Sequence, residues 1–547
     1  MKEKTVILLF LIFLFSSLLR LYQLDTIPPS LYTDEVDQGY NAYSVIKTGA
    51  DEHGNFLPVS FRSFGDWKPP LPTYLMIPFM FILGPNDWSV RLSSAILGIV
   101  SLLLSFKIAK LIFENNRLSF LSVFLLSISP WHLFQSRTAM LVMVSLFFFE
   151  IGIYGFLKYI KNYKFRFLLL SVLGFSLSIY SYYGLRLIVP LTLLSLFLWK
   201  RSEIFSKRKH ILLGVVIGII LLLPIFISGL KERDVLFGRA RTVSIFYDRG
   251  VELKQWELQT QDFENTYSIL TRIFHNKVFL YGRDIIRRYL SHFDLDYLFL
   301  KGDGAFPFQV PHTGILNFSD IILIPLGIYF IVKRKIKNQT ILWIWLIISI
   351  LPASLTFITP ATNRTFNAVV PFSFLSALGF IFLIKYKSKM QIKLIISIIF
   401  ITCLYSFNYF LNSYFIEVPK NYGNIWGYGW EEAMQYIHSQ KDRYNTVYIS
   451  SNKGMPYIYY AFYNQIDPDF IQKKLIRPYI PDAFGFEPVD SFENLFFYRG
   501  RSFKEIRESR ESNILVVVPS DEDDLKGNPV KEIKYPNGKN AIDIYSL

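Results

Sequence analysis

The chain has 547 residues, of which 52% are hydrophobic and 17% aromatic, while only 18% are charged. In soluble domains about a quarter of all residues are charged, so this composition predicts a polytopic α-helical membrane protein. The formal net charge of +15 does not favour nucleic acid as a partner, because the basic residues form short clusters between apolar segments, where membrane topology explains them. The single cysteine, Cys403, excludes a disulfide within the chain and a zinc site built from cysteines.

Apolar segments recur along most of the chain, and about eleven of them are predicted to span a membrane. They cover about residues 5–22, 88–111, 118–130, 138–157, 167–181, 187–199, 211–228, 317–332, 340–357, 367–384 and 392–411. No small-residue cleavage site follows the first segment, so we expect an uncleaved span with a cytoplasmic N-terminus. The short basic loops then all lie on one side, as the positive-inside rule requires.

Residues 71–83 are apolar but short for a crossing, and they contain Pro72 and Pro78. We predict a juxtamembrane or re-entrant helix here. Counting this segment as a full span would place Lys107 and Lys110 outside and would break the charge pattern.

Three longer polar segments are predicted to lie on the outer side: the loops 23–87 and 229–316, and the tail 412–547. The chain is therefore expected to form a transmembrane domain, 1–411, followed by a small extracytoplasmic α/β domain, 412–547. Within the tail we expect buried strands at Thr446–Ser450 and Ile514–Val518, a helix at Trp430–His438 and a terminal hairpin at Ile533–Ile544.

The first outer loop gathers the residues best suited to catalysis. Asp34, Glu35 and Asp37 lie within four positions, and Lys68 precedes two prolines that fix the backbone at the start of an apolar segment. Acids and a lysine held at a membrane boundary suit chemistry on a charged lipid head group. The spacing leaves two interpretations open, a solvated acidic turn or a general base with a second polar contact.

Arginines occupy three of the short outer connections between spans. Arg137 precedes the fourth span, Arg186 follows Tyr183 before the sixth, and Arg364 precedes the tenth. Each is either an interface anchor that reaches the head groups or a phosphate ligand that faces the bundle. The positive-inside rule depletes arginine on this side, so their placement favours a functional role.

The second outer loop contains His292, Asp303 and His312 among many aromatic residues. This segment is expected either to wall a sugar or lipid site or to form an amphipathic helix on the membrane. The spacing of the two histidines and the aspartate matches no metal motif. The sequence has no Gly-rich phosphate loop and no G-x-S-x-G motif, so ATP-driven transport and serine hydrolysis are unsupported.

Several motifs resemble the membrane glycosyltransferases of the C-type fold, above all the protein O-mannosyltransferases and the bacterial aminoarabinose transferases of lipid A. The likeness covers about residues 1–410, and some of the motifs also resemble bacterial members of this group whose function is unassigned. The motifs that carry it are Tyr32-Thr33-Asp34-Glu35, Lys68-Pro69-Pro70-Leu71, Val90–Gly98, Ser129-Pro130-Trp131-His132 with Ser136-Arg137, and Ser291–Asp303.

The resemblance implies a polyprenyl-phosphate sugar donor and inversion at the anomeric carbon. Asp34 matches the acid that activates the acceptor, and Glu35 matches its partner. Lys68 and Arg137 match basic residues near the lipid phosphate, and Arg364 matches more loosely an arginine before a late span. One departure is Leu141, because many bacterial relatives carry an acid about four residues after the arginine of the Ser-Arg motif.

We therefore expect transfer of a hexosyl or pentosyl group to a hydroxyl of a protein, lipid or cell-envelope glycan, on the outer face of the plasma membrane. An obligatory metal or other cofactor is not expected, because fixed lysine and arginine can neutralise the leaving phosphate. The alternative is a lipid or glycan transporter, which would place ionisable groups near mid-span. The predicted spans are almost free of charge at mid-depth, with Glu150 as the exception. The sequence does not identify the sugar, the acceptor or the oligomeric state.

Overall fold

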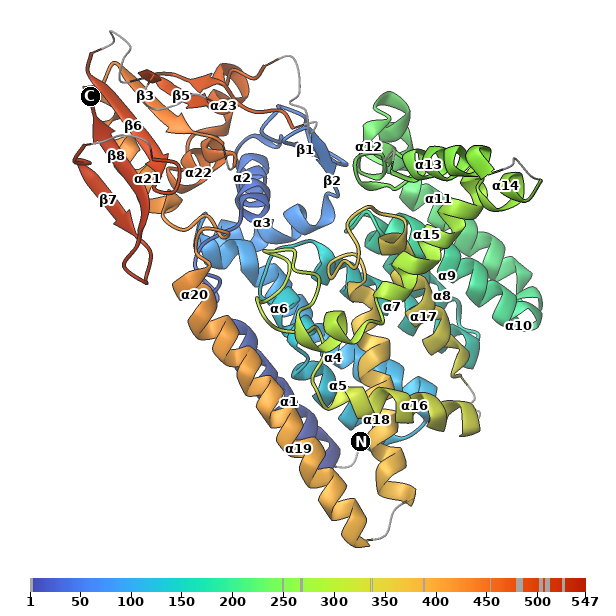
Figure 1. Cartoon of the computed structure of the whole chain (residues 1–547). Helices are drawn as coiled ribbons and strands as arrows, with labels where there is room; N and C mark the ends of the chain where they lie inside the picture. The colour runs from blue at the N-terminus through green and yellow to red at the C-terminus, as the bar shows by residue number, and fades with distance from the viewer. Residues whose placement is uncertain are drawn as a thin grey trace. The chain divides into compact units, whose positions relative to one another are not determined.

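The chain divides into two compact units (Figure 1), each assembled from segments that are far apart in the sequence. The first unit contains Met1–Leu19, Leu97–Gln135 and Leu141–Phe410, and the second contains Arg20–Ile96, Ser136–Met140 and Leu411–Leu547. The computed structural model describes residues 3–247, 250–265, 269–334, 336, 338–386, 389–452, 454–478, 486–500, 505–506, 512–523 and 527–547.

Most apolar helices belong wholly or largely to the first unit, and each predicted span coincides with a helix. These helices are α1 (Glu3–Leu21), α4 (Asp87–Phe113), α5 (Asn116–Ser127), α6 (Pro130–Ser136), α7 (Val142–Asn162), α8 (Phe165–Ile179), α9 (Leu185–Trp199), α11 (Arg208–Lys231), α16 (Asp320–Arg334), α17 (Thr340–Ser354), α18 (Val369–Tyr386) and α19 (Lys389–Asn412). The short helix α10 (Arg201–Phe205) joins α9 to α11, and the 3₁₀ turn η2 (Phe366–Ala368) leads into α18.

Within the described part of the chain, five helices are long and apolar enough to cross a membrane. The pair α5 and α6 adds a sixth if the two are one span, bent by 61° where Pro130 interrupts the helix. Shorter apolar helices account for further predicted spans. The protein is therefore a multi-pass membrane protein, while the number of eleven crossings stays a prediction.

Small residues let the helices of the first unit approach closely. A Cβ added at Gly174 in α8 would lie 2.4 Å from the Gly152 nitrogen in α7, and one at Gly155 would lie 2.5 Å from the Ser171 nitrogen. Backbone contact of this kind is a common way for helices to associate in lipid, where apolar surface alone gives little driving force.

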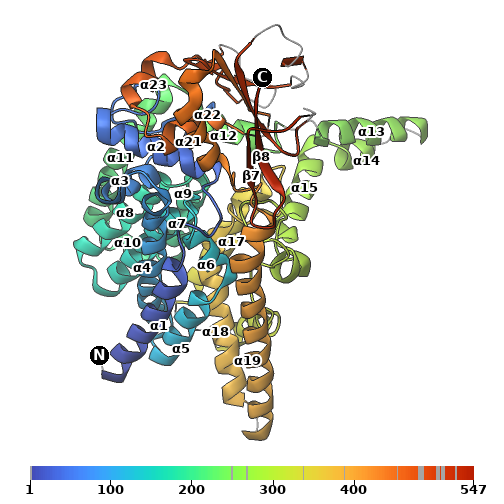
Figure 2. The same cartoon turned by 90° about the vertical axis from the view of Figure 1, so that its left-hand side faces the viewer.

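The second outer loop folds into four helices, α12 (Asp234–Val243), α13 (Gly250–Asn265), α14 (Ile269–Phe274) and α15 (Lys277–Ser291), followed by a π-helical turn, η1 (Asp296–Leu300). Figure 2 shows α13 above α15, and Lys277 pairs with Glu252 at 2.6 Å between them. The sequence left both a site wall and an amphipathic helix open for the segment of His292, Asp303 and His312. This segment follows the end of α15 at Ser291 and contains the turn η1.

The second unit contains α2 (Thr33–Thr48), the hairpin β1 (Phe61–Ser63) and β2 (Asp66–Lys68), α3 (Leu71–Leu83), and the tail. The predicted helix at 71–83 is thus present as α3; its position in a membrane stays a prediction. The last part of α19, the π-helical turn η3 (Ser413–Glu417) and α20 (Val418–Asn421) lead into the tail.

The tail is an α/β structure around a six-stranded sheet with the order β4-β5-β3-β6-β8-β7. The strand β3 runs parallel to β5 and β6, whereas β8 runs antiparallel to β6 and β7. The strands are β3 (Thr446–Ser450), β4 (Ser491–Phe492), β5 (Leu495–Tyr498), β6 (Ile514–Pro519), β7 (Lys531–Lys534) and β8 (Asn540–Ser546), and the helices are α21 (Trp430–Gln440), α22 (Pro456–Tyr463) and α23 (Pro468–Lys474), with the 3₁₀ turn η4 (Lys441–Arg443). The predicted strands, helix and hairpin all lie where expected.

The grouping of segments differs from the linear division expected from the sequence. The tail forms one compact unit with 20–96 and 136–140, whereas the sequence placed those segments in the domain 1–411. Contacts between residues hundreds of positions apart create this grouping, and such contacts leave no local pattern in a sequence.

Candidate active site

The predicted acids lie at the start of α2 in the second unit. Tyr32 precedes the helix in an extended conformation, and its backbone nitrogen donates to Glu35 Oε2 at 3.0 Å. Asp34 and Glu35 fall in the first turn, where carboxylates interact favourably with the helix dipole. Gly49 ends the helix with a positive φ of 72°, a conformation that glycine adopts without strain.

Glu35 is fully buried and pairs with Arg91, which is also fully buried, at 3.2 Å. The other oxygen of Glu35 accepts the backbone N–H of Ala139 at 2.7 Å. Arg91 also donates to the Leu24 and Pro28 carbonyls at 3.1 and 2.9 Å. These bonds occupy Glu35 within the unit, so the geometry favours a positioning role over the catalytic role predicted for it.

Arg91 was part of a resembling motif in the sequence, but its role as the partner of Glu35 was missed. The available signal was its place near the start of an apolar span, because a buried charge in such a segment requires a partner.

Lys68 brings the two other acids together. It ends β2, and its Nζ lies 2.7 Å from Asp34 Oδ1 and 3.0 Å from Asp37 Oδ2. The Asp34 side chain is 39% exposed, whereas those of Lys68 and Asp37 are 9% and 1% exposed. Among the three acids of the cluster, Asp34 therefore has the carboxylate best placed to meet a substrate.

Burial and charge act in opposite directions in this cluster. Burial raises the pKa of Asp37 to about 6, against the opposing effect of the Lys68 charge. Burial lowers the pKa of Lys68, but the charges of Asp34 and Asp37 outweigh it and hold that pKa above its ordinary value. Lys68 is therefore a permanent cation at neutral pH.

Arg137, for which the sequence left an interface anchor or a phosphate ligand open, is fully buried. It donates from Nε to the Tyr414 hydroxyl at 3.1 Å and from Nη2 to the Ile27 carbonyl at 3.0 Å. Its guanidinium stacks on Phe415 with 4.9 Å to the ring centroid. In this conformation Arg137 joins the first loop to the start of the tail.

His292 and Asp303, in the first unit, both hold the loop 355–365 that follows α17. His292 Nε2 accepts the Ala361 N–H at 3.2 Å, and Asp303 Oδ2 accepts the Thr362 N–H at 2.6 Å. Burial lowers the pKa of His292 to about 4, so its imidazole is neutral, and burial raises the pKa of Asp303.

Arg364 belongs to the same loop and closes it on itself. Its Nη1 donates to Thr356 Oγ1 at 2.6 Å and to the Ile358 carbonyl at 3.0 Å. The structure thus brings His292, Asp303 and Arg364 together around one loop, although they are separated by up to 72 positions in the sequence.

Arg186 and Tyr183 lie at the start of α9. Arg186 stacks on Tyr183 at 5.5 Å and donates to the carbonyls of Val235 and Leu236 at 2.7 and 3.0 Å. These contacts attach α9 to α12.

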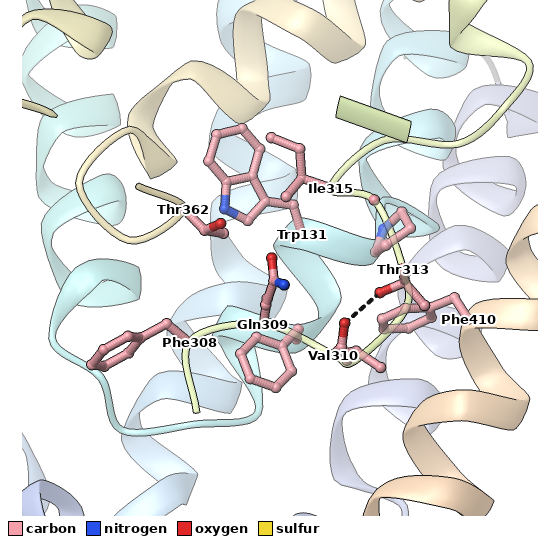
Figure 3. Close-up of a pocket in the computed structure, with 11 residues that line it drawn as sticks. Trp131, Phe308, Gln309, Val310, Thr313, Ile315, Thr362 and Phe410 are labelled. Atoms are coloured by element: carbon pink, nitrogen blue, oxygen red, sulfur yellow. Dashed lines mark hydrogen bonds between the residues drawn. The ribbon is translucent and has the colours of Figure 1, made fainter. Parts of the chain in front are cut away.

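A narrow pocket opens beside the loop of Arg364 (Figure 3). Its volume of about 10 Å³ is about the space of one water molecule. Figure 3 shows Trp131 across the pocket from Phe308, with the Gln309 amide between them, and the Thr313 hydroxyl donates to the Val310 carbonyl at 2.8 Å. The lining is Pro130, Trp131, Phe134, Phe308, Gln309, Val310, Thr313, Gly314, Ile315, Thr362 and Phe410.

Glu150, the mid-span acid noted in the sequence, is buried in α7 of the first unit. Its carboxylate accepts hydrogen bonds from the hydroxyls of Ser101, at 2.6 Å, and Ser105. Ser101 Oγ also lies 3.4 Å from His132 Nε2. The hydroxyls of α4 therefore satisfy this carboxylate inside the helical packing.

Comparisons with known proteins address the fold. ArnT from Cupriavidus metallidurans, solved with bound undecaprenyl phosphate, is similar with a TM-score of 0.54 and 12% identity, over 100% of this chain and 98% of that chain. The oligosaccharyltransferase AglB from Archaeoglobus fulgidus, solved with an inhibitory peptide and a dolichol-phosphate, is similar with a TM-score of 0.51 and 14% identity. This chain has the GT-C glycosyltransferase fold.

This finding confirms the resemblance to C-type membrane glycosyltransferases that the sequence motifs carried. A family profile described as dolichyl-phosphate-mannose-protein mannosyltransferase also matches residues 67–227. The likeness to AglB covers 84% of this chain, which spans 63% of the length of that enzyme. No curated protein sequence matches the chain.

Proposed function

We propose that this protein transfers a sugar from a polyprenyl-phosphate donor to an acceptor hydroxyl, with Asp34 as the general base. The observation that carries the proposal is the partly exposed Asp34 carboxylate, 2.7 Å from the buried cation Lys68, in a chain with the GT-C fold. ArnT was solved with bound undecaprenyl phosphate and AglB with a dolichol-phosphate, and these ligands support the class of donor.

The proposed reaction is a single displacement. Asp34 accepts the proton of the acceptor hydroxyl while the oxygen of that hydroxyl forms a bond to the anomeric carbon. The bond between that carbon and the phosphate oxygen breaks, and the lipid phosphate leaves with an additional negative charge. Lys68 stabilises this charge, and attack opposite the leaving group inverts the anomeric centre.

The position of Lys68 connects the base with the leaving group. Lys68 Nζ donates to Asp34 Oδ1 at 2.7 Å, so a phosphate that binds Lys68 lies next to the proposed base. One cation therefore orients both groups that take part in the displacement.

The remaining predicted residues take supporting roles in this proposal. Glu35 and Arg137 position the first loop, while His292, Asp303 and Arg364 shape the loop 355–365. We propose that no obligatory metal takes part, because Lys68 supplies the positive charge; loss of transfer in EDTA that returns with added Mg²⁺ or Mn²⁺ would contradict this.

A transporter of lipids or glycans is the alternative class. It needs ionisable groups that face a pathway near mid-span. Glu150 lies at such a depth, but Ser101 and Ser105 satisfy its carboxylate within the helix packing. The enzyme proposal is therefore preferred.

The substrates and location are part of the proposal. We place transfer on the outer face of the plasma membrane, with a protein, lipid or envelope glycan as acceptor. Mass spectrometry of cell-surface glycans and glycoproteins, with and without this protein, tests the proposal and identifies the sugar. A glycan profile that does not change would contradict it.

A further inference from the structure

The tail is in contact with the whole length of α2, mainly through the tyrosine-rich helix α22. Figures 1 and 2 both show α22 beside α2. The sequence of α22 is Pro-Tyr-Ile-Tyr-Tyr-Ala-Phe-Tyr, and its residues from Pro456 to Phe462 are buried. A helix this rich in buried hydroxyl groups requires hydrogen-bond partners, and several of them lie in the first outer loop.

Tyr459 binds the start of α2. Its hydroxyl donates to the Leu31 carbonyl at 3.2 Å and lies 3.2 Å from the hydroxyl of Thr33, the residue directly before Asp34. Tyr459 is only 2% exposed, so this hydroxyl bonds inside the protein. The tail therefore fixes the backbone from which Asp34 reaches Lys68.

The middle of α2 is shaped to receive α22. A Cβ added at Gly39 would lie 2.9 Å from the Phe462 ring and 2.8 Å from a methyl group of Val90. Glycine at this position permits the close approach of the two helices.

The second half of α2 and the residues directly after it are also hydrogen-bonded to the tail. The hydroxyls of Tyr40 and Tyr43 in α2 donate to the tail carbonyls of Ile466 and Gln465, at 3.1 and 3.3 Å. The buried carboxylate of Glu52 accepts a hydrogen bond from the Tyr457 hydroxyl at 3.2 Å.

We infer that α22 is a positioning element for the active site, and that Tyr459 is the positioning residue that sets the direction of Asp34. This inference rests on the proposed function, because it gives Asp34 a catalytic role. The inference gives the tail a role in catalysis, because α22 and Tyr459 belong to the tail and position Asp34.

Hydrogen exchange of the purified full chain tests the positioning without any substrate. Tyr459→Phe removes one hydroxyl and keeps the ring, so backbone exchange in the first turn of α2 should rise about fivefold, as loss of one such bond implies. Exchange in α7 and α8 should stay unchanged. Tyr448→Phe, which removes a tail hydroxyl from a different hydrophobic cluster, is the matched control and should leave α2 unchanged.

Activity supplies the second measurement. Tyr459→Phe should lower the maximal rate of transfer about fivefold while binding of undecaprenyl phosphate stays the same, because Lys68 remains in place. Thr33→Val removes the partner hydroxyl from the α2 side and should show the same pattern, which covers the case in which Tyr459→Phe fails to fold.

The outcomes separate this inference from the proposed function. Unchanged exchange in α2, or faster exchange with unchanged transfer, would overturn the positioning role. Normal transfer by Asp34→Asn would overturn the proposed function itself. If Asp34→Asn loses transfer while Tyr459→Phe transfers at the normal rate, only the inference about Tyr459 is overturned.

Discussion

At the scale of single residues, three neighbouring acids differ through their surroundings. Glu35 is enclosed by Arg91 and two backbone N–H groups, Asp37 is buried against Lys68, and Asp34 shares Lys68 while remaining partly exposed. A carboxylate that must accept a proton from a substrate requires access to it. We therefore assign the chemistry to Asp34 and the support of α2 to the two others.

Glu35→Gln should destabilise the protein more than it alters the chemical step. The change leaves the Arg91 charge buried without its carboxylate, which typically costs about 3 kcal/mol or more. Thermal unfolding of the purified protein measures this, with Asp34→Asn as the control of small effect because Asp34 is partly exposed. Unchanged stability with greatly reduced turnover would instead make Glu35 catalytic.

Asp37 should make stability depend on pH. Its pKa is raised from 3.8 to about 6 in the folded protein. Its contribution to the free energy of unfolding is therefore fully present below pH 3.8 and is lost as the pH rises through about 6. The shift corresponds to about 3 kcal/mol. Asp37→Asn should remove this part of the decline between pH 4 and 6 in thermal unfolding, and superimposable pH profiles of the two proteins would refute the assignment.

At the scale of elements, the apolar spans were predictable because hydropathy over a helix length is a local property. The break between α5 and α6 was also visible, since Pro130 ends the apolar segment. The helices α12 to α15 were not predicted individually, because a polar segment gives weak signals, although the pattern of α15 was readable. The partners of Arg91 and Arg137 were not predictable, because they depend on contacts between distant segments.

Packing of α7 against α8 gives a prediction at this scale. Gly174→Ala places a methyl group 2.4 Å from the Gly152 backbone, so the helices must separate, at a typical cost of about 1–3 kcal/mol. The yield of folded protein and the midpoint of thermal unfolding measure this. Gly282→Ala in α15 is the control, because its Cβ meets nothing within 4 Å; equal effects of the two changes would argue against close backbone packing.

At the scale of the whole molecule, the GT-C fold followed from short motifs, but the composition of the two units did not. Residues 20–96 and 411–547 form one compact unit through contacts such as those of Tyr459 and Tyr457. The motif Tyr32–Glu35 indicated the acids, whereas the tail has no motif that would indicate its contacts with α2.

The topology expected from the sequence gives a further prediction. The first loop, residues 229–316 and the tail should share the outer side, because the short basic loops all fall on the other. With Cys403 replaced, single cysteines at the exposed positions Phe56, Val278 and Val530 should react with an impermeant reagent added to intact cells. A tail that reacts only after permeabilisation would contradict this arrangement.

The most direct test of the central claim is the rate of sugar transfer by Asp34→Asn, together with its binding of undecaprenyl phosphate. The substitution keeps the shape of the side chain and removes its ability to accept a proton. Transfer should fall by about 10²–10⁴-fold, the usual contribution of a general base, while lipid binding stays unchanged. Near-normal transfer by Asp34→Asn would contradict the account.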